Sequence, residues 1–126
     1  MGNLTNVQVG SVVLTMIEDV PNNISGIITT FVDNEIYFAE QLTGDSISVS
    51  AIGERYQPAI ISLTASAVVR MMEMTGADVS NLRLGDLSIG KGASSPATIT
   101  SAKLREDGIR KLENLGFKLN YFKALG

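Results

Sequence analysis

Carboxylates, lysines, tyrosines and hydroxyls are the side chains of this chain that could do chemistry, because it contains no His and no Cys. A Ser-His or Cys-His nucleophile, a thiolate metal site and a disulfide framework are therefore excluded. Acidic neighbours occur at Glu18–Asp19 and Glu106–Asp107, but adjacent residues on a helix point about 100° apart and do not form a ready pair. Asp33 and Glu40 are expected on a solvated helix face. We therefore predict that the protein is not an enzyme and needs no cofactor and no metal.

A glycine-rich stretch from Gly85 to Lys91 matches the first positions of a P-loop, whose backbone amides hold phosphates and whose lysine meets the terminal one. The next position of that motif is Ser or Thr, which binds magnesium, and here it is Gly92. The chain also lacks the buried parallel strand that leads into such a loop. Nucleotide binding at this stretch is therefore not predicted.

Charge is divided unequally along the chain, although the net charge of the 126 residues is only −3. Residues 1–54 contain no Lys or Arg and seven acids, which are Glu18, Asp19, Asp33, Glu35, Glu40, Asp45 and Glu54. Residues 103–123 contain six bases against three acids. Each run is typical of a solvated face. Together they also fit a particle that contacts different partners at its two ends.

The hydrophobic pattern predicts a mainly α fold in a single domain over residues 1–126, a small bundle of three to four helices with one β-hairpin and two extended arms. Residues 1–10 are expected to form an extended arm whose strand partner, if any, lies outside its own fold. Residues 11–116 form the helical core, with the hairpin at 82–90, and residues 117–126 form an extended tail.

Caps and apolar spacing predict helices over about 11–17, 23–42, 54–75 and 95–116. Ser11 and Asn23 are the expected caps of the first two, and Gly44 follows the second. The last has a predicted buried face made of Ile99, Ala102, Ile109, Leu112 and Leu115. Gly108 inside it costs about 1 kcal/mol relative to Ala.

The helix expected over 54–75 is apolar on nearly every side, so it must be buried on more than one side. In so small a chain, part of that burial is expected from another subunit. Met71, Met72 and Met74 are expected to pack in the core or against that subunit. The apolar stretch from Pro58 to Val69 is too short and too polar to cross a bilayer of about 30 Å, so no membrane span is predicted.

Four stretches from Glu54 onward occur in the order of a known family. They are residues 54–66 (ERYQPAIISLTAS), 71–76 (MMEMTG), 84–89 (LGDLSI) and 112–119 (LENLGFKL). In pattern and order they resemble the head-tail connector, or adaptor, proteins found in the neck of long-tailed viruses of the siphovirus type. The acidic helix expected over 24–42 fits the helix that precedes these stretches in the family, whereas residues 1–10 match no part of it.

The resemblance implies a structural virion protein, a small helical subunit that assembles into a ring, commonly of twelve copies, beneath the portal protein of a filled capsid. Such a ring extends the channel through which viral DNA passes without sequence-specific binding. It also offers a docking platform for the next neck or tail completion protein. The protein is then expected in the host cytoplasm before assembly and in the neck of the virion afterwards.

The family resemblance further implies that the hairpin and the C-terminal tail contact neighbouring proteins. The expected interface residues are Leu84, Asp86, Leu87, Ile89, Lys118, Tyr121, Phe122, Lys123 and Leu125. Unpaired strands at these places suit addition to the sheet of another chain, because main-chain hydrogen bonds then give affinity.

Two alternatives from other classes stay open at this point. The basic residues Lys103, Arg105, Arg110 and Lys111, followed by Tyr121 and Phe122, would suit a small nucleic-acid-binding module that contacts phosphates and stacks bases. An enzyme that uses carboxylates or Lys is the other, and a pocket that gathers several carboxylates would favour it.

Overall fold

The computed structural model describes residues 2–76 and 101–116 of the chain. Within these ranges it contains α1 (Asn6–Met16), α2 (Asn22–Ser25), α3 (Ile28–Thr43), α4 (Gln57–Met74) and α5 (Ser101–Glu113). The described ranges contain isolated β-bridges but no strand. The prediction of a mainly α fold is therefore confirmed. The predicted hairpin at 82–90 and the extended tail at 117–126 lie outside the described residues, so nothing in the structure supports the hairpin.

The first helix starts earlier than the sequence pattern predicted. Thr5 rather than Ser11 is its N-cap: the Thr5 hydroxyl accepts a hydrogen bond from the Gln8 amide at 3.1 Å, and the Gln8 side chain accepts one from the Thr5 amide at 2.8 Å. This reciprocal pair is a capping box, and it satisfies donors that the first turn leaves free. Residues 6–10 are consequently helical, and the prediction of an extended arm over 1–10 is wrong for that half.

The N-terminal residues also find a partner in their own chain. Leu4 and Ile52 form an antiparallel bridge, with an N–H···O distance of 3.0 Å in one direction and 2.7 Å in the other. The amide of Asn6 donates to the carbonyl of Val49 at 2.8 Å. The loop between α3 and α4 therefore holds the start of the chain, and the expectation of an outside partner for the arm is wrong.

The helix expected over 23–42 is divided into α2 and α3. Ile27, with φ −120° and ψ 22°, leaves helical geometry between them, while Ile24 and Ile28 on either side are both buried. The end of α3 matches the prediction, because Gly44 adopts φ 75° at its C-cap and donates to the Glu40 carbonyl at 2.8 Å. The buried positions Val32, Ile36, Ala39 and Leu42 also follow the predicted spacing.

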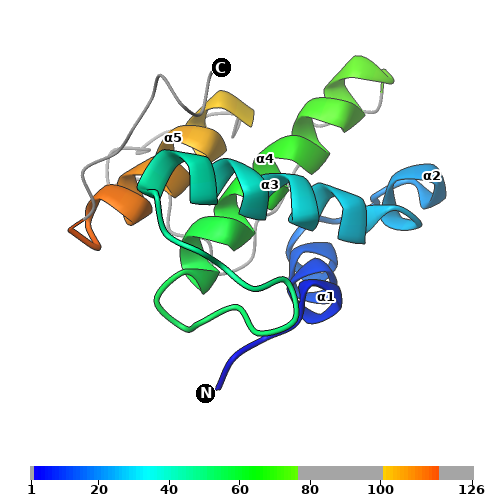
Figure 1. Ribbon diagram of the computed structural model, residues 1–126. Coiled ribbons are helices and arrows are strands. Elements are labelled where there is room, and N and C mark those ends of the chain that lie inside the picture. The colour runs from blue at the N-terminus through cyan, green and yellow to red at the C-terminus, as the bar shows by residue number, and fades with distance from the viewer. Residues whose placement is uncertain (1, 77–100, 117–126) are drawn as a thin grey trace.

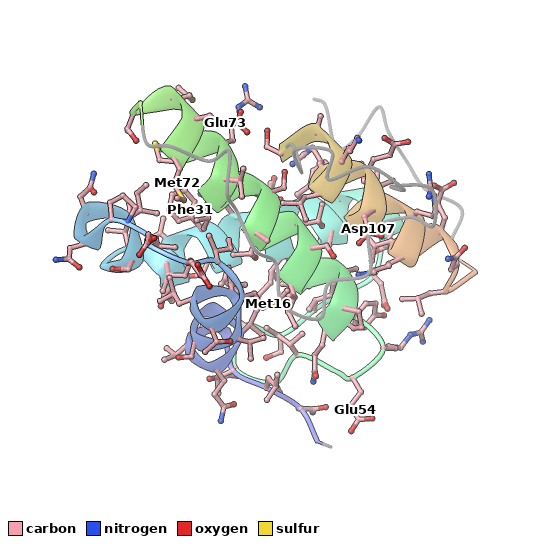
Figure 2. The ribbon with its side chains drawn as sticks, turned by 180° about the vertical axis from the view of Figure 1, so that it is seen from behind. Met16, Phe31, Glu54, Met72, Glu73 and Asp107 are labelled. Carbon is pink, nitrogen blue, oxygen red and sulfur yellow. The ribbon has the colours of Figure 1, made fainter. Side chains whose placement is uncertain are left out.

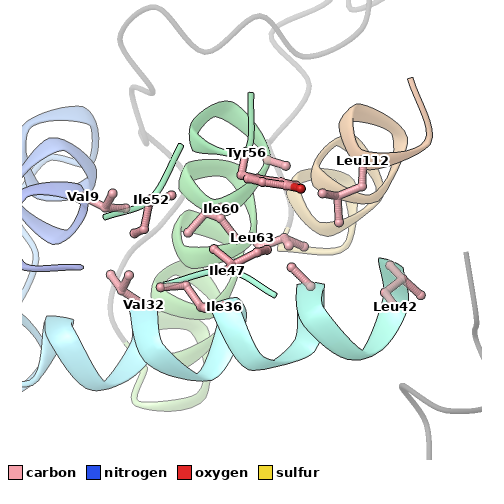
Figure 3. Packing of buried hydrophobic residues seen from close by; sticks show 12 residues of the cluster. Val9, Val32, Ile36, Leu42, Ile47, Ile52, Tyr56, Ile60, Leu63 and Leu112 are labelled. Carbon is pink, nitrogen blue, oxygen red and sulfur yellow. The ribbon is translucent and has the colours of Figure 1, made fainter. Parts of the chain in front are cut away.

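The fourth helix, α4, lies at the centre of the molecule. Figure 1 shows α3 crossing in front of it, and α1, α3 and α5 all pack against it, α5 most extensively. Buried apolar side chains from these helices fill the space between them, as Figure 3 shows for the cluster around Ile36, Ile60 and Leu63. The predicted burial on several sides is therefore confirmed, but helices of the same chain supply it. The burial of α4 therefore gives no evidence for or against another subunit, whose contribution stays a prediction.

The fifth helix packs through a face that matches the predicted one in part. Leu112 is buried and Ile109 and Leu115 are half-buried against the core, as predicted, whereas Ala102 is exposed and Ile99 lies outside the described residues. Leu104 and Gly108 are also buried. A Cβ atom on Gly108 would lie 2.7 Å from Cγ of Leu63 and 3.2 Å from the Ala59 carbonyl oxygen of α4. Gly108 thus allows α4 and α5 to approach closely, which offsets its low helix propensity.

Candidate functional site

A polar cluster joins the middle of α4 to α5. The Ser62 hydroxyl donates to Oδ2 of Asp107 at 2.9 Å, Nζ of Lys111 donates to Ser62 Oγ at 2.9 Å, and Lys111 and Asp107 form an ion pair at 2.8 Å. Asp107 and Lys111 are spaced i,i+4 on α5, which is the spacing that favours such pairs. That spacing was visible in the sequence, but only the packing of α5 on α4 brings Ser62 to it.

Serine beside a lysine amine is an arrangement that can generate a nucleophile, provided that the lysine is neutral and a substrate reaches the hydroxyl. Ser62 has an exposed fraction of 0%, so no substrate carbonyl reaches its oxygen in this structure. Nζ of Lys111 is also held in an ion pair with the Asp107 carboxylate. The three side chains are therefore best explained as a structural contact that joins α4 to α5, and this group of Ser62, Asp107 and Lys111 is called the polar clamp below.

A second charged contact joins α3 to α5 at Glu35 and Arg105, whose nearest oxygen and nitrogen are 3.6 Å apart. The Arg105 guanidinium also lies 4.2 Å from the ring centroid of Phe38. Burial raises the pKa of the Glu35 carboxyl above its ordinary value, and the positive charge of Arg105 opposes this rise. Oε1 of Glu35 has no hydrogen bond within the described part of the chain. Compared with the clamp around Ser62, this contact leaves a polar atom poorly satisfied.

A groove of about 770 Å³ opens beside this ion pair, between α3, the C-terminal half of α4 and the start of α5. Phe31, Arg70, Met71 and Met74 line it together with Glu35 and Arg105. Met74 has an exposed fraction of 72%, so a large apolar side chain lies open at the rim. Figure 2 shows this end of α4 from behind, with Phe31, Met72 and Glu73 labelled close to one another. The sequence pattern did not reveal the groove, because its walls come from three separate helices.

The motif residues at the start of α4 anchor the chain around them. The Tyr56 hydroxyl donates a hydrogen bond to the Asp45 carboxylate. Burial is the larger cause that raises the pKa of Tyr56, and this hydrogen bond raises it further. The buried amide of Gln57 donates to the Ile52 carbonyl at 2.9 Å and to the Gly2 carbonyl at 3.1 Å. These contacts fix the loop after α3 and the N-terminal segment against α4.

The predicted solvated positions Asp33 and Glu40 are half-buried and have structural partners. Asp33 accepts from the Asn6 side chain at 2.7 Å, and Glu40 accepts from the Ile47 amide at 2.9 Å. The expectation of a solvated face at these residues is therefore wrong, because α1 and the following loop pack beside them. Glu106 and Asp107 do point to different partners, Arg110 and Lys111, as their spacing predicted.

The basic residues of α5 are largely engaged within the chain. Arg105 pairs with Glu35, Arg110 with Glu106 at 3.4 Å, and Lys111 with Asp107. These ion pairs reduce the positive charge that α5 could offer to phosphate, so they do not favour the nucleic-acid-binding alternative. The predicted interface residues at 84–89 and 118–125 lie outside the described residues.

The described residues lack two other kinds of feature. They contain no group of three or more carboxylates placed to hold a metal ion. They also contain no helix that is long and apolar enough to cross a membrane. The chain matches no family model, no curated protein and no solved structure.

Proposed function

We propose that the protein is a structural subunit of a virus neck, a head-tail connector that forms a ring between the portal and the tail. In this role it extends the DNA channel and supplies a platform for the next neck or tail protein, without catalysis. The observation that carries the proposal is the run of sequence from Glu54 onward, whose four stretches resemble that family in pattern and order. The ring of about twelve copies and the portal contact are parts of the same proposal.

The first stretch of this run, residues 54–66, has a defined part in the described fold, which supports the proposal. Residues 57–66 of the first stretch form the first half of α4, against which α1, α3 and α5 pack. Tyr56 and Gln57 in the same stretch anchor the neighbouring loop and the N-terminal segment. The residues of the first stretch are thus among those that organise the described helical domain.

The distribution of charge gives a second, independent line of support. A ring with two distinct ends must present different surfaces to the portal side and to the tail side. Residues 1–54 contain only acidic charges, and the bases occur from Arg55 onward. An acidic surface toward the channel would also repel the phosphates of DNA and keep the DNA from binding tightly.

Electron microscopy of the full chain mixed with its portal protein tests the proposal. We expect rings seated coaxially on the portal, each with an open central channel. Fields that contain only bare portals and monomers of this chain, at concentrations where the portal itself is intact, would contradict it.

The alternative of a nucleic-acid-binding module makes a different prediction in the same preparation. Its signature is DNA binding by the isolated chain that weakens steeply with salt and is lost when Lys103, Arg105, Arg110 and Lys111 are neutralised. We expect no such binding at physiological salt.

A further inference from the structure

We propose that the groove between α3, α4 and α5 is the subunit contact of the ring, and that it receives the acidic turn at Glu18–Asp19 of a neighbouring copy. This inference rests on the proposed function, because a ring needs two different faces on each subunit. It goes beyond that function by naming both faces. The apolar rim at Met74 and the cation of Arg70 are the groove's contribution to the contact.

The charged side chain that the groove offers to a partner is Arg70. It is exposed on the groove wall and has no ion-pair partner among the described residues, in contrast to Arg105, Arg110 and Lys111. Glu73, one turn further on the same helix, is exposed on the same wall, so an incoming carboxylate must lie on the Arg70 side, away from this like charge. An incoming acidic segment would meet Arg70 beside the exposed thioether of Met74, which is flexible enough to pack against varied surfaces.

The turn between α1 and α2 is the segment with the matching charge. Of the seven acids in residues 1–54, the other five have partners or interactions within the chain, whereas Glu18 and Asp19 are exposed and have none in the described ranges. The turn is also held in shape: Ile17 before it is buried, Val20 after it packs on the same cluster, and Asp19 adopts φ 58°. Such a preformed turn loses little conformational entropy on binding.

The two faces are different surfaces of the subunit, as a head-to-tail ring requires, although Phe31 and Met71 both line the groove and pack on the cluster beneath the turn. Ile17 packs in the cluster that contains Val68 and Met72, while Arg70 and Met74 line the groove. Residues two apart on a helix point about 200° apart, so Val68 and Arg70 face nearly opposite directions, as do Met72 and Met74. A subunit that binds through its acidic turn and through a separate groove makes a heterologous contact, which closes into a ring when the rotation permits.

Disulfide cross-linking tests the contact directly, because the chain contains no cysteine of its own. The full-length chain with both Glu18→Cys and Met74→Cys is oxidised under the conditions in which the wild type forms rings. We expect a ladder of covalent multiples of 13.4 kDa on a denaturing gel. The matched control pairs Met74→Cys with Glu113→Cys, an exposed acid at the end of α5, and should give no ladder.

Three results of the cross-linking would overturn the contact. They are an equally strong ladder in the control, a disulfide within one chain, and rings of the test variant that give no ladder. The last result would leave the proposed function intact, since the rings themselves persist. Absence of rings in the wild type, with and without the portal, would instead contradict the proposed function.

Charge exchange provides a test that does not depend on disulfide geometry. Arg70→Glu and Glu18→Lys should each weaken assembly about tenfold, since like charges then meet, and the double variant should recover most of the loss. Arg110→Glu, which reverses an exposed cation away from the groove, should assemble like the wild type. Wild-type assembly by Arg70→Glu, or no recovery in the double variant while circular dichroism shows a folded chain, would overturn the proposal.

Discussion

The contact between α4 and α5, called the seam here, is closely packed in its middle, the closed part, and widens into the groove at one end, the open part. The same two helices take part in both regions. In the middle, Gly108 lets the helices approach and Ser62, Asp107 and Lys111 satisfy one another. At the open end, the Ser66 hydroxyl donates to the Ser101 carbonyl at 2.7 Å, and beyond it the groove begins. The difference indicates that the closed part holds the fold, whereas the open part is free to bind a partner.

Among substitutions in the seam, the largest effect should come from filling the closed part at Gly108. Gly108→Val places a branched side chain where even a Cβ atom lies 2.7 Å from Leu63. We expect a loss of about 2–3 kcal/mol in the free energy of unfolding, measured by chemical denaturation, because overpacking forces the two helices apart. Ala102→Val, on the exposed side of α5, is the control and should cost well under about 1 kcal/mol. Equal effects of the two substitutions would remove the distinction between the two parts of the seam.

A smaller loss is expected when the polar clamp is broken. Asp107→Ala leaves the buried Ser62 hydroxyl and the Lys111 ammonium without their acceptor, which should cost about 2 kcal/mol of unfolding free energy. Glu106→Ala, one residue away, removes only an exposed ion pair and should cost about 0.5 kcal/mol or less. If thermal unfolding shows the same shift for both variants, the clamp does not hold the seam.

At Glu35 we predict a change in pH dependence rather than a large loss of stability. The folded pKa lies above the ordinary value of about 4.5, so between these two values the folded state binds more protons than the unfolded chain. The contribution of Glu35 to the free energy of unfolding therefore falls as the pH rises through that window. Glu35→Gln should abolish this fall, whereas Glu113→Gln at an exposed position should not. Denaturation curves that keep the same pH dependence in Glu35→Gln would show that the Glu35 carboxyl is not its source.

The smallest effect on stability is expected at the rim of the open part. Met74→Ser should change the free energy of unfolding by about 0.5 kcal/mol or less, because its side chain is already exposed. Met72→Ser, two residues earlier and buried, should cost about 3 kcal/mol. A large loss of stability in Met74→Ser would show that this side chain supports the fold of the monomer.

The sequence predicted what depends on local pattern. Apolar spacing located the buried positions of α3, Pro58 marked the first turn of α4, and Gly44 and Gly76 follow the helices as expected, both with positive φ. The capping box at Thr5 and Gln8 was also a local signal, but the apolar alternation around Val7 and Val9 led to an extended prediction. In this segment the hydrogen bonds of the capping box favour a helix over the extended conformation that the alternation suggested.

The candidate sites could not be predicted in the same way, because they depend on which helices meet. The role of Gly108 follows only from the position of Leu63, and Glu35 is buried because α5 brings Arg105 to it. The groove likewise joins residues from three helices. The helix over 54–75 was correctly predicted to be buried on several sides, but amphipathic pattern does not say whether its own chain or another chain covers it.

Native mass spectrometry of the full-length chain, alone and with the portal protein, tests the central claim most directly. The account predicts a closed assembly whose mass is a single integer multiple of 13.4 kDa, near twelve copies, with Arg70→Glu shifted toward the monomer. A chain that stays monomeric in both samples would contradict the account.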